Sequence, residues 1–178
     1  MENMSYLLGC IVGVLVGVII VAILAKKIHS DGNYISKYDE MQMITRGKAY
    51  KYAFWAIVII EALFGILLSA DIKLPLSAPL LHIIVIFIGI IVQISYCIWN
   101  NAYIGLNDNM NRFAIFSVFI SLFNFGIAFH SYRKGELIVN GVFQTNFINL
   151  VCGFLFIIIG VELLIKKIFD GKEEKEAA

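Results

Sequence analysis

The sequence predicts an all-α membrane protein, a bundle of five transmembrane helices with a short extracytoplasmic β-hairpin, in a single domain over residues 1–178. Of the 178 residues, 60% are hydrophobic and only 15% are charged, whereas soluble domains average about 45–50% and about 25%. This composition excludes a disordered chain, a coiled coil and a basic nucleic-acid-binding domain, so we expect the lipid bilayer and not nucleic acid as a partner.

Five apolar stretches approach the length of about 20 residues that a membrane-spanning helix needs. They are continuous, which favours helices over the alternating pattern of a membrane β-barrel. A positive segment follows the first stretch instead of preceding it, the opposite of a signal peptide, so we expect this helix to be retained. The predicted spans are about 6–25, 52–70, 80–99, 113–130 and 147–168.

The positive residues between the spans predict the orientation of the chain, because cytoplasmic loops carry an excess of Lys and Arg. Eleven Lys and Arg residues fall on one side of the predicted topology and three on the other. The sequence therefore predicts an external N-terminus and a cytoplasmic C-terminus.

The first span carries Gly9, Gly13 and Gly17, whose four-residue spacing places all three on one helix face. Such a face allows the backbone of a second helix to approach closely. Two interpretations remain open: packing against another helix of the same chain, or formation of a homodimer.

Glu61 lies near the middle of the second span, where no intramembrane Arg or Lys is present to pair with it. A charged carboxylate at that depth costs at least ~2.5–3.5 kcal/mol. We expect Glu61 to face the bundle interior, either as a proton or cation site or as a neutral carboxylic acid that is hydrogen-bonded to another helix. Glu162 has Lys166 four residues later, which predicts a favourable helical pair.

Polar residues on the later spans form stripes that could share an interior with Glu61. These stripes are explained either by interhelical hydrogen bonds or by a water-filled path. The candidate intramembrane polar site consists of Glu61, Gln93, Tyr96, Asn124 and Asn149.

Three segments outside the spans have recognisable patterns. Ser36, with Asp39 three residues later, predicts a helix N-cap, and the basic and aromatic residues that follow suit either anionic lipid or a docked cytoplasmic protein. The asparagine-rich segment 100–111 lacks the glycine and glutamate of a calcium loop. Asn140-Gly141 between β-forming residues predicts the external hairpin.

Two segments resemble a group of uncharacterised small bacterial integral membrane proteins. They are YDEMQMITRGKAYKYAF, residues 38–54, and CIWNNAYIGLN, residues 97–107; Met41 stands where the group usually has Arg, and Asn101 where it has Asp. The resemblance implies a multi-pass protein of the bacterial inner membrane with a cytoplasmic cluster as its signature. The cluster would contain Asp39, Glu40, Arg46, Lys48, Asn101 and Tyr103.

The chain contains no catalytic or phosphate-binding motif, and its three histidines fall on different segments. We therefore expect no enzyme activity, no cofactor and no metal. The leading hypothesis is a non-enzymatic membrane protein that interacts with or regulates a membrane or cytoplasmic protein through its cytoplasmic loops. The alternative is a small transporter or channel that uses Glu61 and the polar helix faces.

Overall fold

Four helices in the described part of the chain are long and apolar enough to cross a membrane. The structure is a computed structural model and describes residues 12, 15–16, 19, 23 and 36–176. The chain therefore has the architecture of a multi-pass membrane protein. The helices are α2 (Glu40–Ser69), α3 (Ala78–Trp99), α4 (Met110–Arg133) and α5 (Ile148–Glu176).

The predicted first span, 6–25, lies mostly outside the described residues, and Gly9, Gly13 and Gly17 lie entirely outside them. The helix predicted over residues 6–25 and its packing face thus remain predictions. The other four predicted spans coincide with α2 to α5, although α2 begins twelve residues before the predicted start at Tyr52. This extension is the helix that the N-cap pattern before it predicts to continue into the second span; it mixes Met and Ile with charged and polar residues.

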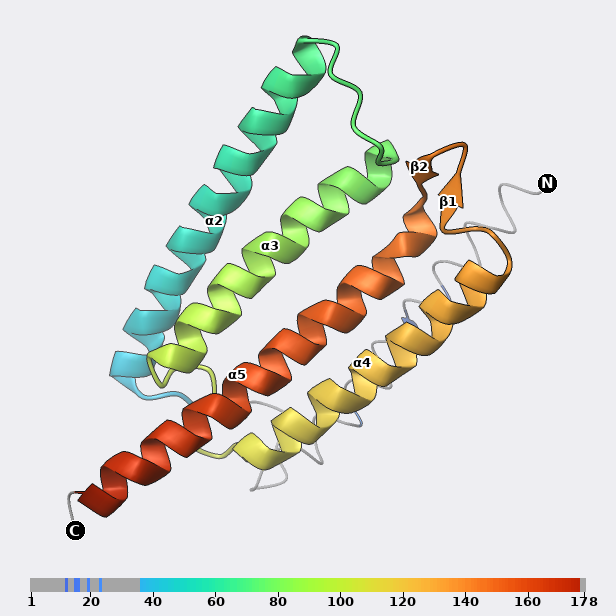
Figure 1. Cartoon of the computed structure of the whole chain (residues 1–178). Helices are drawn as coiled ribbons and strands as arrows, with labels where there is room; N and C mark the ends of the chain where they lie inside the picture. The colour runs from blue at the N-terminus through green and yellow to red at the C-terminus, as the bar shows by residue number, and fades with distance from the viewer. Residues whose placement is uncertain (1–11, 13–14, 17–18, 20–22, 24–35, 177–178) are drawn as a thin grey trace.

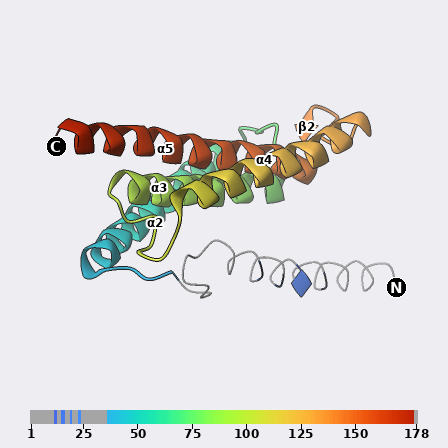
Figure 2. The same ribbon diagram turned by 90° about the horizontal axis from the view of Figure 1, so that it is seen from below.

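The helices lie side by side in the order α2, α3, α5, α4 (Figure 1). Figure 2 shows that they run along the same long dimension of the molecule. Consecutive helices alternate in direction, so the bundle has two ends. We call the end with the start of α2, the α3–α4 connection and the C-terminus the junction end, and the opposite end the sheet end.

Small residues set the helix spacing on both sides of the bundle. A Cβ added to the buried Gly89 of α3 would lie 2.5 Å from Ile57 Cδ1 of α2, so these helices are in close contact there. Between α4 and α5, the Ser121 hydroxyl donates to the Gly153 carbonyl at 2.8 Å. A stripe of small α4 residues is buried at this interface: Ala114, Ser117, Ser121 and Ala128.

The sheet end carries a small antiparallel sheet of β1 (Ile138–Val139) and β2 (Val142–Phe143). Asn140 and Gly141 connect the strands with φ angles of 52° and 77°, values that Asn and Gly adopt most readily in such turns. The short 3-10 helix Thr145–Phe147 leads from β2 into α5.

The α2–α3 connection is attached to this sheet by backbone hydrogen bonds. The Phe143 amide donates to the Pro75 carbonyl at 2.8 Å, and the Ser77 amide donates to the Phe143 carbonyl at 2.9 Å. Residues about 70 positions apart are thus joined through β2.

Candidate functional site

The start of α2 is fixed by a capping box. The Asp39 carboxylate accepts from the Gln42 amide at 2.7 Å, and the Gln42 side-chain oxygen accepts from the Asp39 amide at 3.2 Å. Asp39, and not Ser36, is therefore the N-cap. The sequence interpretation was wrong by three residues because a glutamine at the third helical position completes the box as well as a glutamate does.

Two side chains of α2 then attach the helix to the α3–α4 connection. The Gln42 amide nitrogen donates to the carbonyls of Asn101 at 2.8 Å and Ile104 at 3.0 Å. One turn later, the Arg46 guanidinium donates to the Ala102 carbonyl at 3.2 Å. Backbone carbonyls that follow a helix end need such donors.

The segment before α2 meets the same connection through its backbone. The Leu106 amide donates to the Lys37 carbonyl, and the Lys37 amide donates to the Asn107 side chain, both at 2.7 Å. A Cβ added to the buried Gly105 would lie 2.8 Å from the Lys37 carbonyl oxygen, so only glycine permits this approach.

Aromatic residues pack beneath these hydrogen bonds. The Arg46 guanidinium lies 4.1 Å from the centre of the Tyr38 ring, a distance typical of a cation–π contact. Tyr103 packs edge-on against Phe113, with the ring centres 5.8 Å apart. We call residues 36–46 and 101–108, which these contacts hold together, the junction.

Burial of Tyr103 raises the pKa of its phenol to about 12. The nearby Tyr38 adds to this effect, and the positive charge of Arg46 opposes it. The phenol consequently stays neutral over the physiological range and packs as part of the junction, without acting as a base.

The six candidate cytoplasmic residues separate into two groups. Four of them build the junction: Asp39 by capping α2, Arg46 and Tyr103 by their side chains, and Asn101 by its carbonyl and its left-handed φ of 57°. Glu40 and Lys48 are exposed on the surface of α2. The structure thus brings the two sequence segments together and gives most of their polar residues a structural partner.

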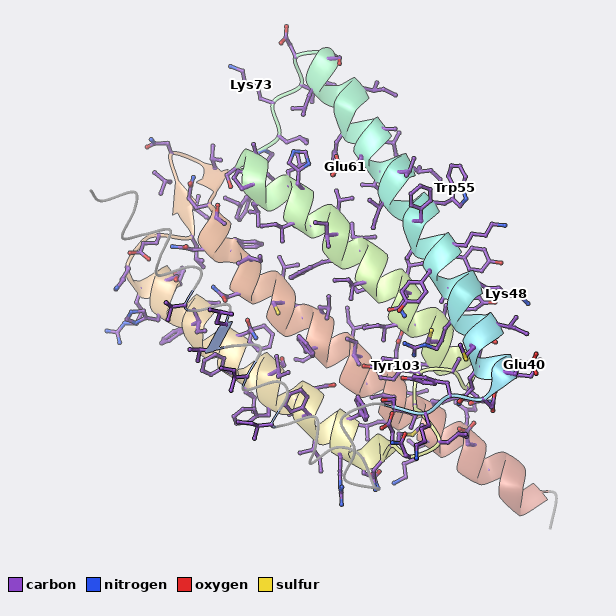
Figure 3. All side chains as sticks on the ribbon, turned by 180° about the vertical axis from the view of Figure 1, so that it is seen from behind. Glu40, Lys48, Trp55, Glu61, Lys73 and Tyr103 are labelled. Carbon is purple, nitrogen blue, oxygen red and sulfur yellow. The ribbon has the colours of Figure 1, made fainter. Side chains whose placement is uncertain are left out.

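Glu61 has a partner that sequence reasoning did not find. The Glu61 carboxylate lies 3.0 Å from His82 Nδ1 of α3, and Figure 3 labels Glu61 on the side of α2 that faces α3. The carboxylate is about 12 Å from the end of α2, counted at about 1.5 Å per residue. The side chains of His82 and Glu61 are 59% and 37% exposed, so the pair lies at the surface of the helix layer and not in its interior.

The other members of the predicted intramembrane site do not join Glu61. Asn124 Nδ2 donates to the Ile120 carbonyl, and Asn149 Nδ2 donates to the Asn146 carbonyl, so each amide bonds within its own segment. Gln93 Nε2 contacts Cys97 Sγ, one turn later on α3.

Tyr96 contacts Tyr52 of α2 through its ring, with the ring centres 5.0 Å apart. Helices α2 and α4 lie at opposite edges of the layer. Glu61 and Asn124 therefore do not face one another.

The prediction for Glu162 is also corrected. Lys166 pairs with Asp170 at 2.6 Å and not with Glu162. Both acidic residues lie four positions from the lysine, and the sequence offered no reason to prefer the later one. One carboxylate oxygen of Glu162 is buried without a hydrogen-bond partner among the described residues.

Two residues important for these contacts were missed, although the sequence contained a signal for each. Gln42 lies three residues after Asp39, which is the spacing of a capping box. His82 lies on the same face of α3 as Gly89, and that face packs against α2.

Comparison of the chain with protein-family models, with curated proteins and with solved structures gives no match.

Proposed function

We propose that this chain is a non-enzymatic multi-pass membrane protein that binds a partner protein at its junction end, and that this end is cytoplasmic. The observation that carries the proposal is the convergence of residues 36–46 and 101–108 on one folded surface. The segments are held together by side chains over about 60 residues of sequence. A fixed surface of this kind lowers the entropy cost of binding a partner.

The distribution of charge supports the cytoplasmic side for this end. Of the 12 Lys and Arg residues in the described part of the chain, only Lys73, Arg133 and Lys134 belong to the sheet end. A cytoplasmic junction end follows from the rule that relates positive loops to topology, and the sheet then lies outside. The inner membrane of a bacterium is the location that the resemblance of the two motifs favours.

Exposed side chains around the junction supply contact area for a partner. Leu106 is 68% exposed, and Met41 of α2 is 71% exposed. Glu40 and Lys48 add charges of both signs nearby. Apolar side chains with a polar surround are typical of protein interaction surfaces.

Site-specific photocrosslinking in native membranes tests the proposal. A photoreactive amino acid at Leu106 is expected to give a discrete protein adduct, because this side chain lies on the junction. The same amino acid at Ile138, which is 51% exposed at the sheet end, is the matched control. The absence of an adduct at Leu106, or identical adducts at both positions, would contradict a partner at the junction end.

A second candidate, a small proton- or cation-coupled transporter, is supported by the Glu61–His82 pair. The two titratable side chains lie 3.0 Å apart within apolar segments. Placing ionisable groups there costs free energy in a membrane, so such residues are candidates for a functional role. The local hydrogen bonds of Asn124 and Asn149 count against a shared path, so this function ranks second. Proteoliposome flux that disappears in Glu61→Gln and persists in a Glu162→Gln control would reverse the order.

A further inference from the structure

Helix α2 has two different faces over residues 40–55. One face packs against the rest of the molecule: Ala49 and Ala53 are buried, and Gln42 and Arg46 bond the α3–α4 connection. The opposite face carries side chains at spacings of three, four, three and four residues, which places them on one stripe of a helix. We call it the outer stripe, and its members are Met41, Ile44, Lys48, Lys51 and Trp55.

Every member of the outer stripe is exposed. Met41 is 71% exposed, Ile44 49% and Trp55 52%, and both lysines are exposed as well. Figure 3 shows Lys48 and Trp55 on the side of α2 that faces away from α3. The described part of the chain therefore leaves this stripe uncovered.

The N-terminal half of the outer stripe lies outside the hydrocarbon of the membrane. Gln42 and Arg46, on the opposite face of the same turns, bond backbone carbonyls of residues 101–104. That connection is irregular, and irregular backbone exposed to lipid does not occur within the hydrocarbon region. Met41 and Ile44 consequently lie at the level of headgroups or water, where acyl chains cannot cover them. Exposed apolar side chains beside charges at this level are typical of a protein interaction surface.

The charge of the outer stripe discriminates between its possible occupants. Among the described residues, Lys48 and Lys51 form no ion pair. Two copies of α2 that cross the membrane in the same direction would oppose Lys48 with Lys48, and the predicted span 6–25 is followed at this end by Lys26 and Lys27. Like charges that face one another disfavour both occupants. An acidic helix from another protein is complementary instead.

We propose that the outer stripe binds an amphipathic helix of another protein that carries acidic side chains. The apolar side chains of this helix cover Met41, Ile44 and the ring of Trp55. Its carboxylates pair with Lys48 and Lys51. The inference rests on the partner-binding function proposed above and adds the chemistry of the partner.

The charges along α2 also fix where the acidic side chains of the partner lie. Glu40 is exposed at the N-terminal end of the helix, about 12 Å from Lys48 at about 1.5 Å per residue. Carboxylates of the partner are repelled by Glu40 and attracted by the lysines. They therefore lie opposite Lys48 and Lys51, at the membrane end of the outer stripe.

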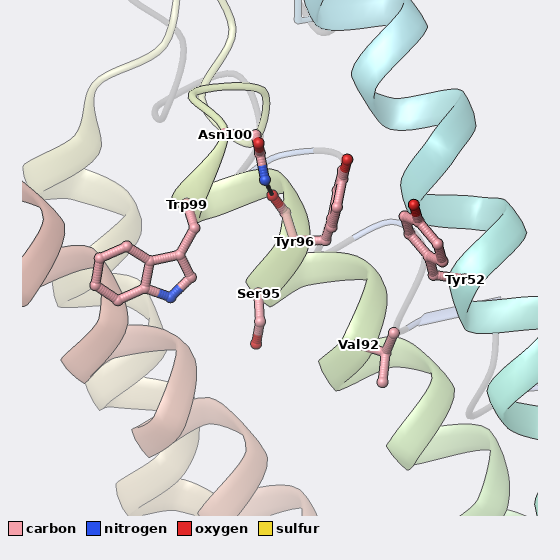
Figure 4. Close-up of a pocket in the computed structure, with 6 residues that line it drawn as sticks. All are labelled: Tyr52, Val92, Ser95, Tyr96, Trp99 and Asn100. Carbon is pink, nitrogen blue, oxygen red and sulfur yellow. Dashed lines mark hydrogen bonds between the residues drawn. The ribbon is translucent and has the colours of Figure 1, made fainter.

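Two synthetic helical peptides test the charge of the occupant. Both have one face of leucines; the polar face carries glutamates in the first and lysines in the second, and a nitroxide at the centre of each quenches nearby tryptophan. The protein is reconstituted in uncharged phosphatidylcholine vesicles. A Trp99→Phe variant leaves Trp55 of the outer stripe as the reporter. A Trp55→Phe variant leaves Trp99, which projects from α3 toward Phe169 of α5 and away from α2 (Figure 4).

We expect the acidic peptide to bind at Trp55 about fivefold more tightly than the basic peptide, which is the contribution of two exposed ion pairs. Trp99 should report no such difference. Lys48→Glu in the Trp55 reporter should bring the ratio close to one. Lys73→Glu is the matched control, since it makes the same change of charge at an exposed position of the sheet end and should leave the ratio unchanged.

Three results would overturn the proposal: equal binding of both peptides at Trp55, the same preference at both tryptophans, or a preference that persists in Lys48→Glu. Brominated lipids test the bilayer as the occupant. Stronger quenching of Trp55 by brominated phosphatidylglycerol than by brominated phosphatidylcholine, lost in Lys48→Glu and without any peptide preference, would assign the lysines to lipid headgroups and also overturn it. A Leu106 adduct in native membranes without a peptide preference would retain the partner and exclude this chemistry for it.

Discussion

The two ends of the bundle join distant parts of the chain by different means. At the junction end, Gln42 and Arg46 reach across to backbone carbonyls of the α3–α4 connection. At the sheet end, Phe143 bonds Pro75 and Ser77 almost entirely through backbone groups. One end therefore depends on the identity of its side chains, whereas the other depends mainly on the path of its backbone.

This difference indicates which segments carry sequence-specific information. Backbone hydrogen bonds tolerate most substitutions, because every residue except proline carries the same donor and acceptor. Side-chain bonds to backbone carbonyls are lost with the side chain and leave those carbonyls unsatisfied. Mutations at the junction should consequently destabilise the protein more than mutations at the sheet.

The largest effect is expected for Gly105→Ala at the junction. Its Cβ would lie 2.8 Å from both the Lys37 carbonyl oxygen and Asp108 Oδ2, so the two segments must separate. We expect a loss of about 3 kcal/mol in the free energy of unfolding, as for other overpacked sites. Thermal unfolding in detergent measures the change.

The matched control for this prediction is Gly126→Ala on α4, where nothing lies within 4 Å of the added Cβ. Alanine is the better helix former by up to ~1 kcal/mol, so this variant should be unchanged or more stable. Equal destabilisation at both glycines would show that the junction is not specially constrained.

The next effect is the pH dependence contributed by Tyr103. Its pKa of about 12 exceeds the ordinary value of 10.0 because the phenol is buried, so the folded state holds the proton more tightly than the unfolded state. The resulting stability is complete below about pH 10 and is lost as the pH rises through about 12, by roughly 2–3 kcal/mol. Unfolding of wild type and Tyr103→Phe across this range measures it, and parallel pH profiles would contradict the assignment.

Part of the junction was predictable from the sequence, because the resemblance singled out residues 38–54 and 97–107 together. The exact contacts were not predictable. The donors of Gln42 and Arg46 bond backbone carbonyls, which carry no mark of residue type in the acceptor segment. Tyr103 was identified as a candidate, but its role as a buried neutral phenol required the packing of α3 and α4.

For the intramembrane polar residues, the sequence grouped side chains that the fold separates. Polarity and depth identified Glu61, but its partner depended on how far α2 and α3 are displaced along one another. Helical periodicity assigns a residue to a face and gives no register between helices. For this reason, the sequence grouped Asn124 and Asn149 with Glu61, whereas the helix order separates α4 from α2.

A smaller effect separates two glutamines, one at each end. Gln42→Ala removes two bonds to the α3–α4 connection and should cost about 2 kcal/mol at the usual ~1 kcal/mol per net bond. Its third bond, from the exposed Asp39 amide, can be replaced by water. Gln144→Ala at the sheet end removes one bond to the Val142 carbonyl, two residues away. Thermal unfolding of both variants tests the comparison, and a larger loss for Gln144→Ala would reverse it.

The smallest effect is expected at the turn between β1 and β2. Gly141 has a φ of 77°, but nothing lies within 4 Å of an added Cβ. Gly141→Ala should therefore lower the free energy of unfolding only by the cost of holding alanine in the left-handed backbone conformation, about 1 kcal/mol. The backbone bonds of Phe143 do not involve this side chain and should persist. Amide hydrogen exchange at Phe143 and Ser77 measures whether they do. Loss of their protection in Gly141→Ala would mean that the sheet end depends on a single residue as strongly as the junction end does, and the contrast between the two ends would fail.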